Sequence, residues 1–128
     1  MLRGLSIAVL VIVAILFTAC GKADIHITQE DAVRIMKSNP DAIVLDVRMK
    51  DEFDKRHLPN ALLVPIDELR NGNFSALPDK DATILIYCWT GRRAEESAAI
   101  LLEHGYSRVY EFGGLVDWTG DVEGTEVK

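Results

Sequence analysis

The sequence predicts an α/β protein with a mostly parallel sheet. Three short apolar runs lack the alternation of half-exposed strands, which favours strands covered on both faces: residues 42–45, 61–64 and 83–87. Amphipathic segments with helical periodicity stand before and between these runs, so helices and strands alternate along the chain. This alternation is typical of a parallel sheet flanked by helices.

The first helix is expected directly after Thr28. Thr28, with Asp31 three residues later, forms a start that resembles a capping box. The apolar residues that follow recur on one helical face, and Pro40 ends the segment. The apolar run at 42–45 then predicts the first strand, which ends in Asp46.

A second helix is expected from Arg93 to His104, because Ala94, Ala98 and the two leucines that follow share one side. Gly105 marks its end. Val109-Tyr110 predicts a last short strand before a pair of glycines.

Residues 1–19 are expected to form an export signal rather than part of the fold. Arg3 supplies a positive start, and residues 5–17 are apolar apart from Ser6. The 15 residues from Leu5 to Ala19 fall short of the about 20 that cross a bilayer as a helix. An uncleaved membrane anchor is the alternative.

The end of this segment, Thr18-Ala19-Cys20, resembles the lipobox of bacterial lipoproteins. That resemblance implies that Cys20 is acylated and becomes the first residue after cleavage. Phe17 stands where leucine is usual. We therefore expect an exported, membrane-anchored lipoprotein that faces outside the cytoplasm, in the periplasm or at the cell surface.

The charge of the chain excludes some partners. It has 14 Lys and Arg against 20 Asp and Glu, a formal net charge of −6. An acidic domain is a poor candidate for binding nucleic acid or anionic lipid through its surface. Attachment to a membrane would then depend on the lipid at Cys20.

Cys20 and Cys88 are the two cysteines of the chain. If Cys20 is acylated, Cys88 is alone, either as a small buried apolar side chain or as a reactive thiol. A disulfide between them is a third possibility, which lipidation of Cys20 would exclude.

Cys88 follows an apolar strand and precedes a helix, at the edge where open α/β sheets bind ligands. A tight loop there turns backbone N–H groups inward, and with the positive end of the helix they would stabilise a cysteine thiolate. Gly91 permits the backbone angles of such a loop. Arg92 and Arg93 oppose the helix dipole, which suggests a negative group nearby. A core cysteine before an ordinary helix is the alternative.

Cys88-x-x-Gly91-x-Arg93 resembles the active-site loop of single-domain rhodaneses. Further matching stretches occur in the family's order: Ile43 to Arg48, Glu52-Phe53, His57-Leu58-Pro59-x-Ala61, Pro65 to Leu69, Gly105-Tyr106, Val109-Tyr110, and Gly113 to Trp118. Arg56 and Asn60 depart from it, since the family commonly has glycine at both positions.

The resemblance implies a single rhodanese-like domain at residues 25–118, with a mostly parallel five-stranded sheet flanked by helices. Residues 20–24, before this domain, are interpreted as the lipid-anchor cysteine and a short polar spacer. Residues 119–128 are expected to form a loosely ordered tail, because they are polar. The expected activity moves sulfur in two steps, from a small donor such as thiosulfate to a thiol or cyanide-like acceptor. We expect no metal, no organic cofactor and no binding of nucleic acid. We expect the protein to be a monomer.

Carried onto this chain, the resemblance makes Cys88 the nucleophile and persulfide carrier. The loop N–H groups of Trp89, Thr90, Gly91, Arg92 and Arg93 would hold the outer sulfur. Arg93 takes the loop-closing position. Asp46 and Arg48 would support the site, with Asp46 pairing to Arg93.

Other functions stay open at this point. Cysteine phosphatases and arsenate reductases of the same fold place arginine six positions after the cysteine, whereas Arg93 is at position five and Ala94 at position six. A binding module or a redox sensor is the other alternative, although no second thiol would remain to resolve an oxidised Cys88. His57 and His104 are interpreted as structural, and the 51–54 run as a solvated helix face.

Overall fold

The computed structural model describes residues 24–127. Its four strands form one parallel sheet in the order β2-β1-β3-β4: β1 Ile43–Asp46, β2 Leu62–Leu63, β3 Thr83–Cys88 and β4 Arg108–Gly114. The predicted α/β class with a parallel sheet is confirmed. The expected export segment and Cys20 lie outside the described residues.

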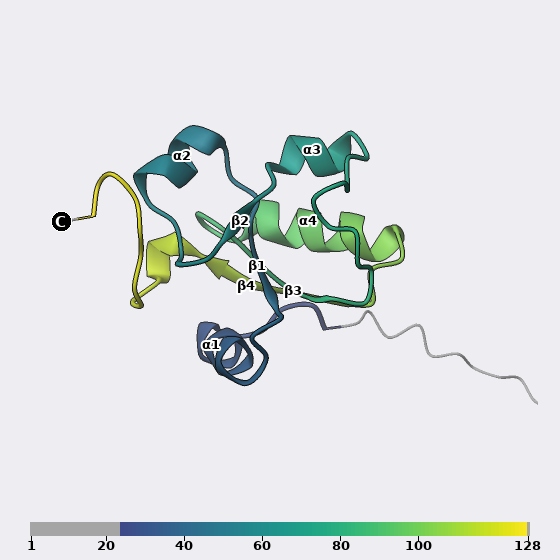
Figure 1. Ribbon diagram of the computed structural model, residues 1–128, viewed down its shortest axis with the longest axis horizontal. Helices are drawn as coiled ribbons and strands as arrows, with labels where there is room; N and C mark the ends of the chain where they lie inside the picture. Colours follow the sequence, from purple (N-terminus) through teal and green to yellow (C-terminus); the bar gives the residue numbers. More distant parts are fainter. Residues whose placement is uncertain (1–23, 128) are drawn as a thin grey trace, which may run out of the picture.

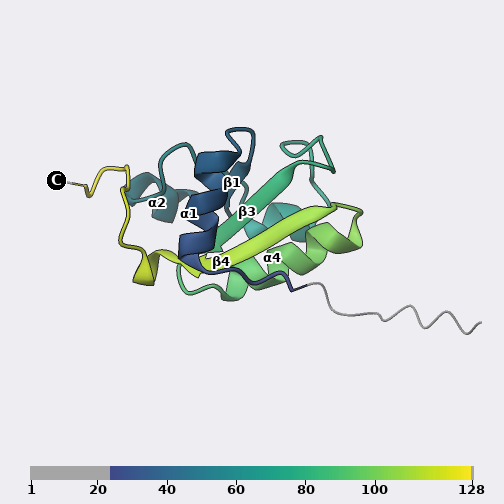
Figure 2. The ribbon, with the colours of Figure 1, turned by 90° about the horizontal axis from the view of Figure 1, so that it is seen from below.

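Helices cover both faces of the sheet: α1 Gln29–Ser38, α2 Lys50–Lys55, α3 Ile66–Arg70, α4 Arg92–Glu103 and the short 3-10 helix η1 Leu115–Asp117. In Figure 1, α1 lies on one side of the sheet, and α3 and α4 lie on the other. Figure 2 shows α1 in front of β3 and β4, with α4 behind them.

The core is split by the sheet into two clusters, and β3 contributes to both. Ile84, Ile86 and Cys88 pack into the cluster on the α4 side, whereas Leu85 and Tyr87 pack into the cluster on the α1 side. Alternate side chains of a strand point to opposite faces, so the side chain of Cys88 is directed toward α4.

The start of α1 is the one predicted. The hydroxyl oxygen of Thr28 accepts a hydrogen bond of 3.0 Å from the backbone N–H of Asp31. This cap satisfies one of the donors that a helix start leaves free.

Residues 24–127 form four strands rather than the expected five. A single bridge between His26 and Glu111 extends the sheet beyond β4: Ile27 N donates to Glu111 O and Glu111 N donates to Ile25 O, at 2.9 and 2.7 Å. The chain then enters α1, whose N-cap is Thr28. The side chain of His26 contacts Glu111 through Nδ1 and Oε1 at 2.5 Å.

The strand expected at 61–64 is shorter and more exposed than predicted. β2 has two residues, and 37% of the surface of Leu62 is exposed. The prediction of burial on both faces was wrong here, because β2 is the edge strand and only β1 pairs with it.

The C-terminal tail is not loosely ordered as expected. Glu123 and His57 exchange two backbone hydrogen bonds of 2.8 Å. Thr125 N donates to Asp54 O, and Glu126 N donates to Lys55 O. These bonds hold the polar tail beside α2, where Figure 1 shows it.

Two features are absent from residues 24–127, a membrane-spanning helix and a metal-binding cluster. No helix in this part of the chain is long and apolar enough to cross a membrane. No group of three or more histidine, cysteine or acidic side chains there is arranged to hold a metal ion.

Candidate active site

Cys88 is the last residue of β3 and is a free thiol with 1% of its surface exposed. Its Sγ accepts a hydrogen bond of 3.0 Å from the backbone N–H of Gly91. The loop after β3 therefore directs one backbone donor at the sulfur.

Gly91 holds the loop in a conformation that other residues rarely adopt. Its φ of +107° lies in the left-handed region, and the residue forms the N-cap of α4. A Cβ at this position would also come within 3.2 Å of the Cα of Gly113. The expectation that Gly91 permits a special turn is confirmed.

Gly114 lets the loop lie directly against the end of β4. Cys88 is paired with Gly114 in the sheet, and Val116 N donates to Trp89 O at 3.1 Å. A Cβ on Gly114 would lie 1.9 Å from Trp89 O and 2.7 Å from the backbone nitrogen of Thr90. No side chain fits at Gly114 without moving the Trp89–Thr90 peptide.

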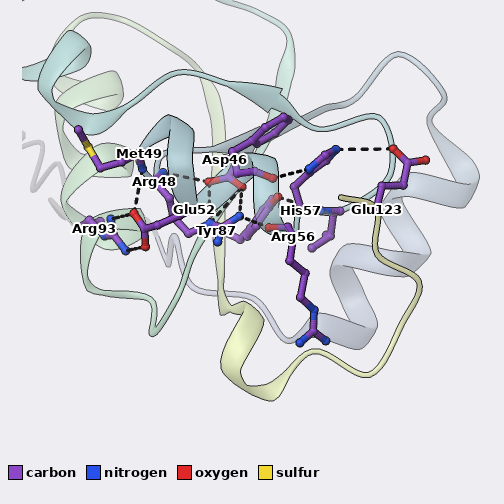
Figure 3. A network of polar contacts seen from close by, with 11 residues as sticks. Asp46, Arg48, Met49, Glu52, Arg56, His57, Tyr87, Arg93 and Glu123 are labelled. Atoms are coloured by element: carbon purple, nitrogen blue, oxygen red, sulfur yellow. Dashed lines mark hydrogen bonds and ion pairs between the residues drawn. The ribbon is translucent and has the colours of Figure 1, made fainter. Parts of the chain in front are cut away.

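Arg93 is held by Glu52 rather than by Asp46 (Figure 3). Its Nη1 and Nη2 donate to Oε2 and Oε1 of Glu52 at 2.8 and 2.9 Å, which joins α4 to α2. The expected Asp46–Arg93 pair was wrong. Glu52, interpreted as part of a solvated helix face, was missed, although it belongs to the Glu52-Phe53 stretch that resembles the rhodanese family.

This ion pair shifts the pKa values of both partners. The hydrogen bond from Arg93 is the main cause that lowers the pKa of Glu52 from 4.5 to about 2. The hydrogen bond to Glu52 is likewise the main cause that raises the pKa of Arg93, and Cys88 adds a smaller effect in the same direction. The guanidinium of Arg93 therefore lies near Cys88 as well as Glu52.

Replacing Glu52 by glutamine is expected to lower the free energy of unfolding by about 1–2 kcal/mol at pH 7, because the pair is about two-thirds buried. Since the pKa of Glu52 is lowered on folding, the carboxylate contributes fully above pH 4.5 and loses its contribution as the pH falls toward 2. Urea unfolding of both proteins between pH 7 and pH 2 should show the difference shrinking over that window.

Asp54→Asn is the matched control, because Asp54 lies in the same helix in an exposed pair with Lys50. Its effect should stay below about 0.5 kcal/mol at every pH. An effect of Glu52→Gln that equals the control would contradict the assigned role of the Arg93 pair.

Asp46 and Arg48 form a buried pair of their own. Arg48 Nη2 donates to Asp46 Oδ2 at 2.7 Å, and the two side chains are 3% and 0% exposed. Arg48 also donates to the backbone oxygen of Arg56. Asp46 is on the α1 side of the sheet with Val44 and Tyr87, because residues two apart in a strand share a face. Cys88 is on the other side, which explains why Asp46 does not reach Arg93.

Contacts made by Tyr87 and His57 fix the turn after α2. Leu58 N donates to the hydroxyl oxygen of Tyr87 at 3.0 Å, and burial is the main cause that raises the pKa of Tyr87. The ring of His57 contacts the backbone oxygen of Phe53 through Nδ1 at 2.7 Å and stacks on the ring of Phe53. These contacts give His57 a structural place rather than one beside the sulfur.

One departure from the family pattern has a simple structural explanation. Asn60 occupies a position where glycine is common, and its φ is +61°. Asparagine tolerates this left-handed conformation better than most residues other than glycine. The exchange therefore preserves the turn at 58–61, which lies apart from the Cys88 loop.

Comparison with known proteins gives one family. The model of the rhodanese-like domain matches residues 28–121. The thiosulfate sulfurtransferase PspE of Escherichia coli is 36% identical over 73 residues, which cover 57% of this chain and 70% of that protein. A tRNA uridine(34) hydroxylase of Pectobacterium carotovorum is 34% identical over 93 residues, but the chain spans only 26% of its length.

Solved structures give the same result. A structure described as rhodanese with anions from E. coli has a TM-score of 0.59 and 31% identity, covering 66% of this chain and 99% of that chain. A rhodanese-like domain protein from Staphylococcus aureus has a TM-score of 0.67 and 25% identity, covering 78% and 97%.

Proposed function

The chain belongs to the rhodanese-like domain family, and on this basis we propose that it is a sulfurtransferase in which Cys88 carries sulfur as a persulfide. The observation that carries the proposal is the position of Cys88. A buried thiol ends β3, accepts a hydrogen bond from Gly91 N and lies near the guanidinium of Arg93. The proposed reaction uses the thiolate of Cys88, because the thiolate is the nucleophilic form of cysteine.

The first half of the proposed reaction loads the sulfur. The thiolate of Cys88 attacks the outer sulfur of thiosulfate, and the sulfur–sulfur bond of the donor breaks. Sulfite leaves with the electron pair of that bond, and Cys88 is left as a persulfide anion. The N–H of Gly91 and the guanidinium of Arg93 would stabilise the new charge.

The second half returns Cys88 to its thiolate. A nucleophilic acceptor attacks the outer sulfur, and the bond between this sulfur and Cys88 Sγ breaks. Cyanide would leave as thiocyanate and a thiolate would leave as a persulfide. The two halves together consume no oxidant or reductant, so Cys88 needs no second thiol.

The experiment that tests the proposal is intact mass spectrometry of the purified protein before and after thiosulfate. We expect a gain of one sulfur atom, which cyanide removes. If a folded protein with an alkylatable Cys88 gains no sulfur from thiosulfate or from an inorganic polysulfide, the proposed persulfide carrier is wrong. Arsenate and phosphate esters would then be the substrates to examine.

We propose further that the protein is exported and attached to a membrane by a lipid on Cys20. The support is the Thr18-Ala19-Cys20 sequence after an apolar segment, which resembles a lipobox. The acidic charge of −6 would not itself favour an anionic membrane surface.

Cys20→Ser is expected to leave the protein unprocessed and without lipid, because serine has no thiol to acylate. Mass spectrometry of the membrane fraction should find the lipid on the original protein and the full-length chain in the variant. Cys88→Ser is the control and should leave processing unchanged. If the variant shows the same processing state and the same membrane attachment as the original protein, an uncleaved anchor is favoured.

A further inference from the structure

A groove of about 700 Å³ opens beside the Cys88 loop. This volume falls within the range of about 300–1,000 Å³ that is usual for small-molecule sites. Thr90 lines it from the loop and Arg70 from the end of α3, while α4 contributes residues 92, 93, 95, 96 and 99. Residues 92, 95, 96 and 99 recur at helical spacing, so one face of α4 forms much of the wall.

The groove is lined by charged side chains of both signs, three arginines and two glutamates. Two of its arginines are already paired: Arg93 with Glu52, and Arg70 with Glu96. Within residues 24–127, neither Arg92 nor Glu95 enters an ion pair. The groove therefore presents one unpaired positive and one unpaired negative side chain, three residues apart on one helix.

The groove also borders the loop that follows Cys88. Arg93 and Thr90 line the groove, and the guanidinium of Arg93 lies near Cys88. Thr90 lies two residues after Cys88 and is exposed. A small molecule in the groove would have its reactive end beside the loop that holds the sulfur.

We propose that this groove binds the sulfur acceptor and that the acceptor is a low-molecular-weight amino-acid thiol such as cysteine. Arg92 would bind the carboxylate and Glu95 the ammonium group. The inference rests on the proposed function. The thiolate of the acceptor attacks the outer sulfur, the bond to Cys88 Sγ breaks, and its electron pair returns to Cys88 while the acceptor leaves as a persulfide.

The test uses the persulfide form of the full protein and four thiols: cysteine, 3-mercaptopropionate, cysteamine and 2-mercaptoethanol. Loss of the added sulfur, followed by intact mass, gives a rate constant for each. Each rate constant is divided by that for neutral 2-mercaptoethanol, and variants are compared by this ratio. The comparison between variants then cancels the intrinsic reactivity of each thiol.

Arg92→Gln is expected to lower the ratio for 3-mercaptopropionate about fivefold and to leave the ratio for cysteamine unchanged. Glu95→Gln is expected to lower the ratio for cysteamine about fivefold without changing that for 3-mercaptopropionate. Both variants should lower the ratio for cysteine. Arg108→Gln is the matched control, since Arg108 is exposed at the opposite end of the sheet, and should change none of the ratios.

The acceptor site is overturned if the rate ratios of Arg92→Gln and Glu95→Gln match those of Arg108→Gln. The persulfide on Cys88 would still stand in that case. A protein that gains no sulfur at all would overturn both proposals. These failures are distinguishable, because loading is measured before any acceptor is added.

Discussion

Cys88→Ser is expected to reduce sulfur transfer from thiosulfate by more than about a thousandfold. A serine hydroxyl does not ionise at neutral pH and cannot form a persulfide, so both halves of the reaction lose their nucleophile. Two measurements check this prediction. Thiocyanate production should disappear, and the intact mass of the variant should not change after incubation with thiosulfate.

The fold of this variant should survive, which separates loss of chemistry from loss of structure. Serine is close to cysteine in size, and its oxygen is still able to accept a hydrogen bond from Gly91 N. We expect a change in unfolding free energy of no more than about 2 kcal/mol and an unchanged circular dichroism spectrum. If the variant transfers sulfur at a rate within tenfold of that of the original protein, Cys88 is not the nucleophile.

Gly114→Ala is expected to have the largest effect of any substitution outside the Cys88 loop. The φ of Gly114 is −156°, which any residue adopts, so the cost comes entirely from the 1.9 Å approach of a Cβ to Trp89 O. The Trp89–Thr90 peptide must move, and with it the N–H groups beside the sulfur. We expect a loss of about 2–3 kcal/mol in stability and of about a hundredfold in transfer.

Gly113→Ala is the matched control, because it adds strain without a clash. Gly113 has a φ of +88°, and a Cβ there meets nothing within 4 Å. It should cost about 1 kcal/mol in unfolding free energy, measured in urea, and should leave transfer within a few-fold of the original. If Gly114→Ala impairs transfer no more than Gly113→Ala, the close approach to Trp89 does not position the loop.

The sequence alone was enough to predict the fold class, the two longest helices and the place of Cys88 between a strand and a helix. These features depend on local patterns: the unbroken apolar runs at 42–45 and 83–87, the Thr28 cap, and a cysteine between a strand and a helix. Local backbone chemistry acts over a few residues, so it can be read directly from the chain. The turn glycine at 91 was predicted for the same reason.

Only the tertiary structure decided which side chains lie around the Cys88 loop. Glu52 and Arg93 meet although they are 41 positions apart, and Asp46 faces away from Arg93 because the pleat of β1 directs it to the other side of the sheet. The tail was predicted to be loose because its residues are polar, yet its backbone bonds to the α2 region. The sequence showed Gly114 only as one of two glycines after the last strand, whereas its role depends on how close Trp89 lies. Contacts of this kind follow from packing between distant segments, which no local pattern in the sequence records.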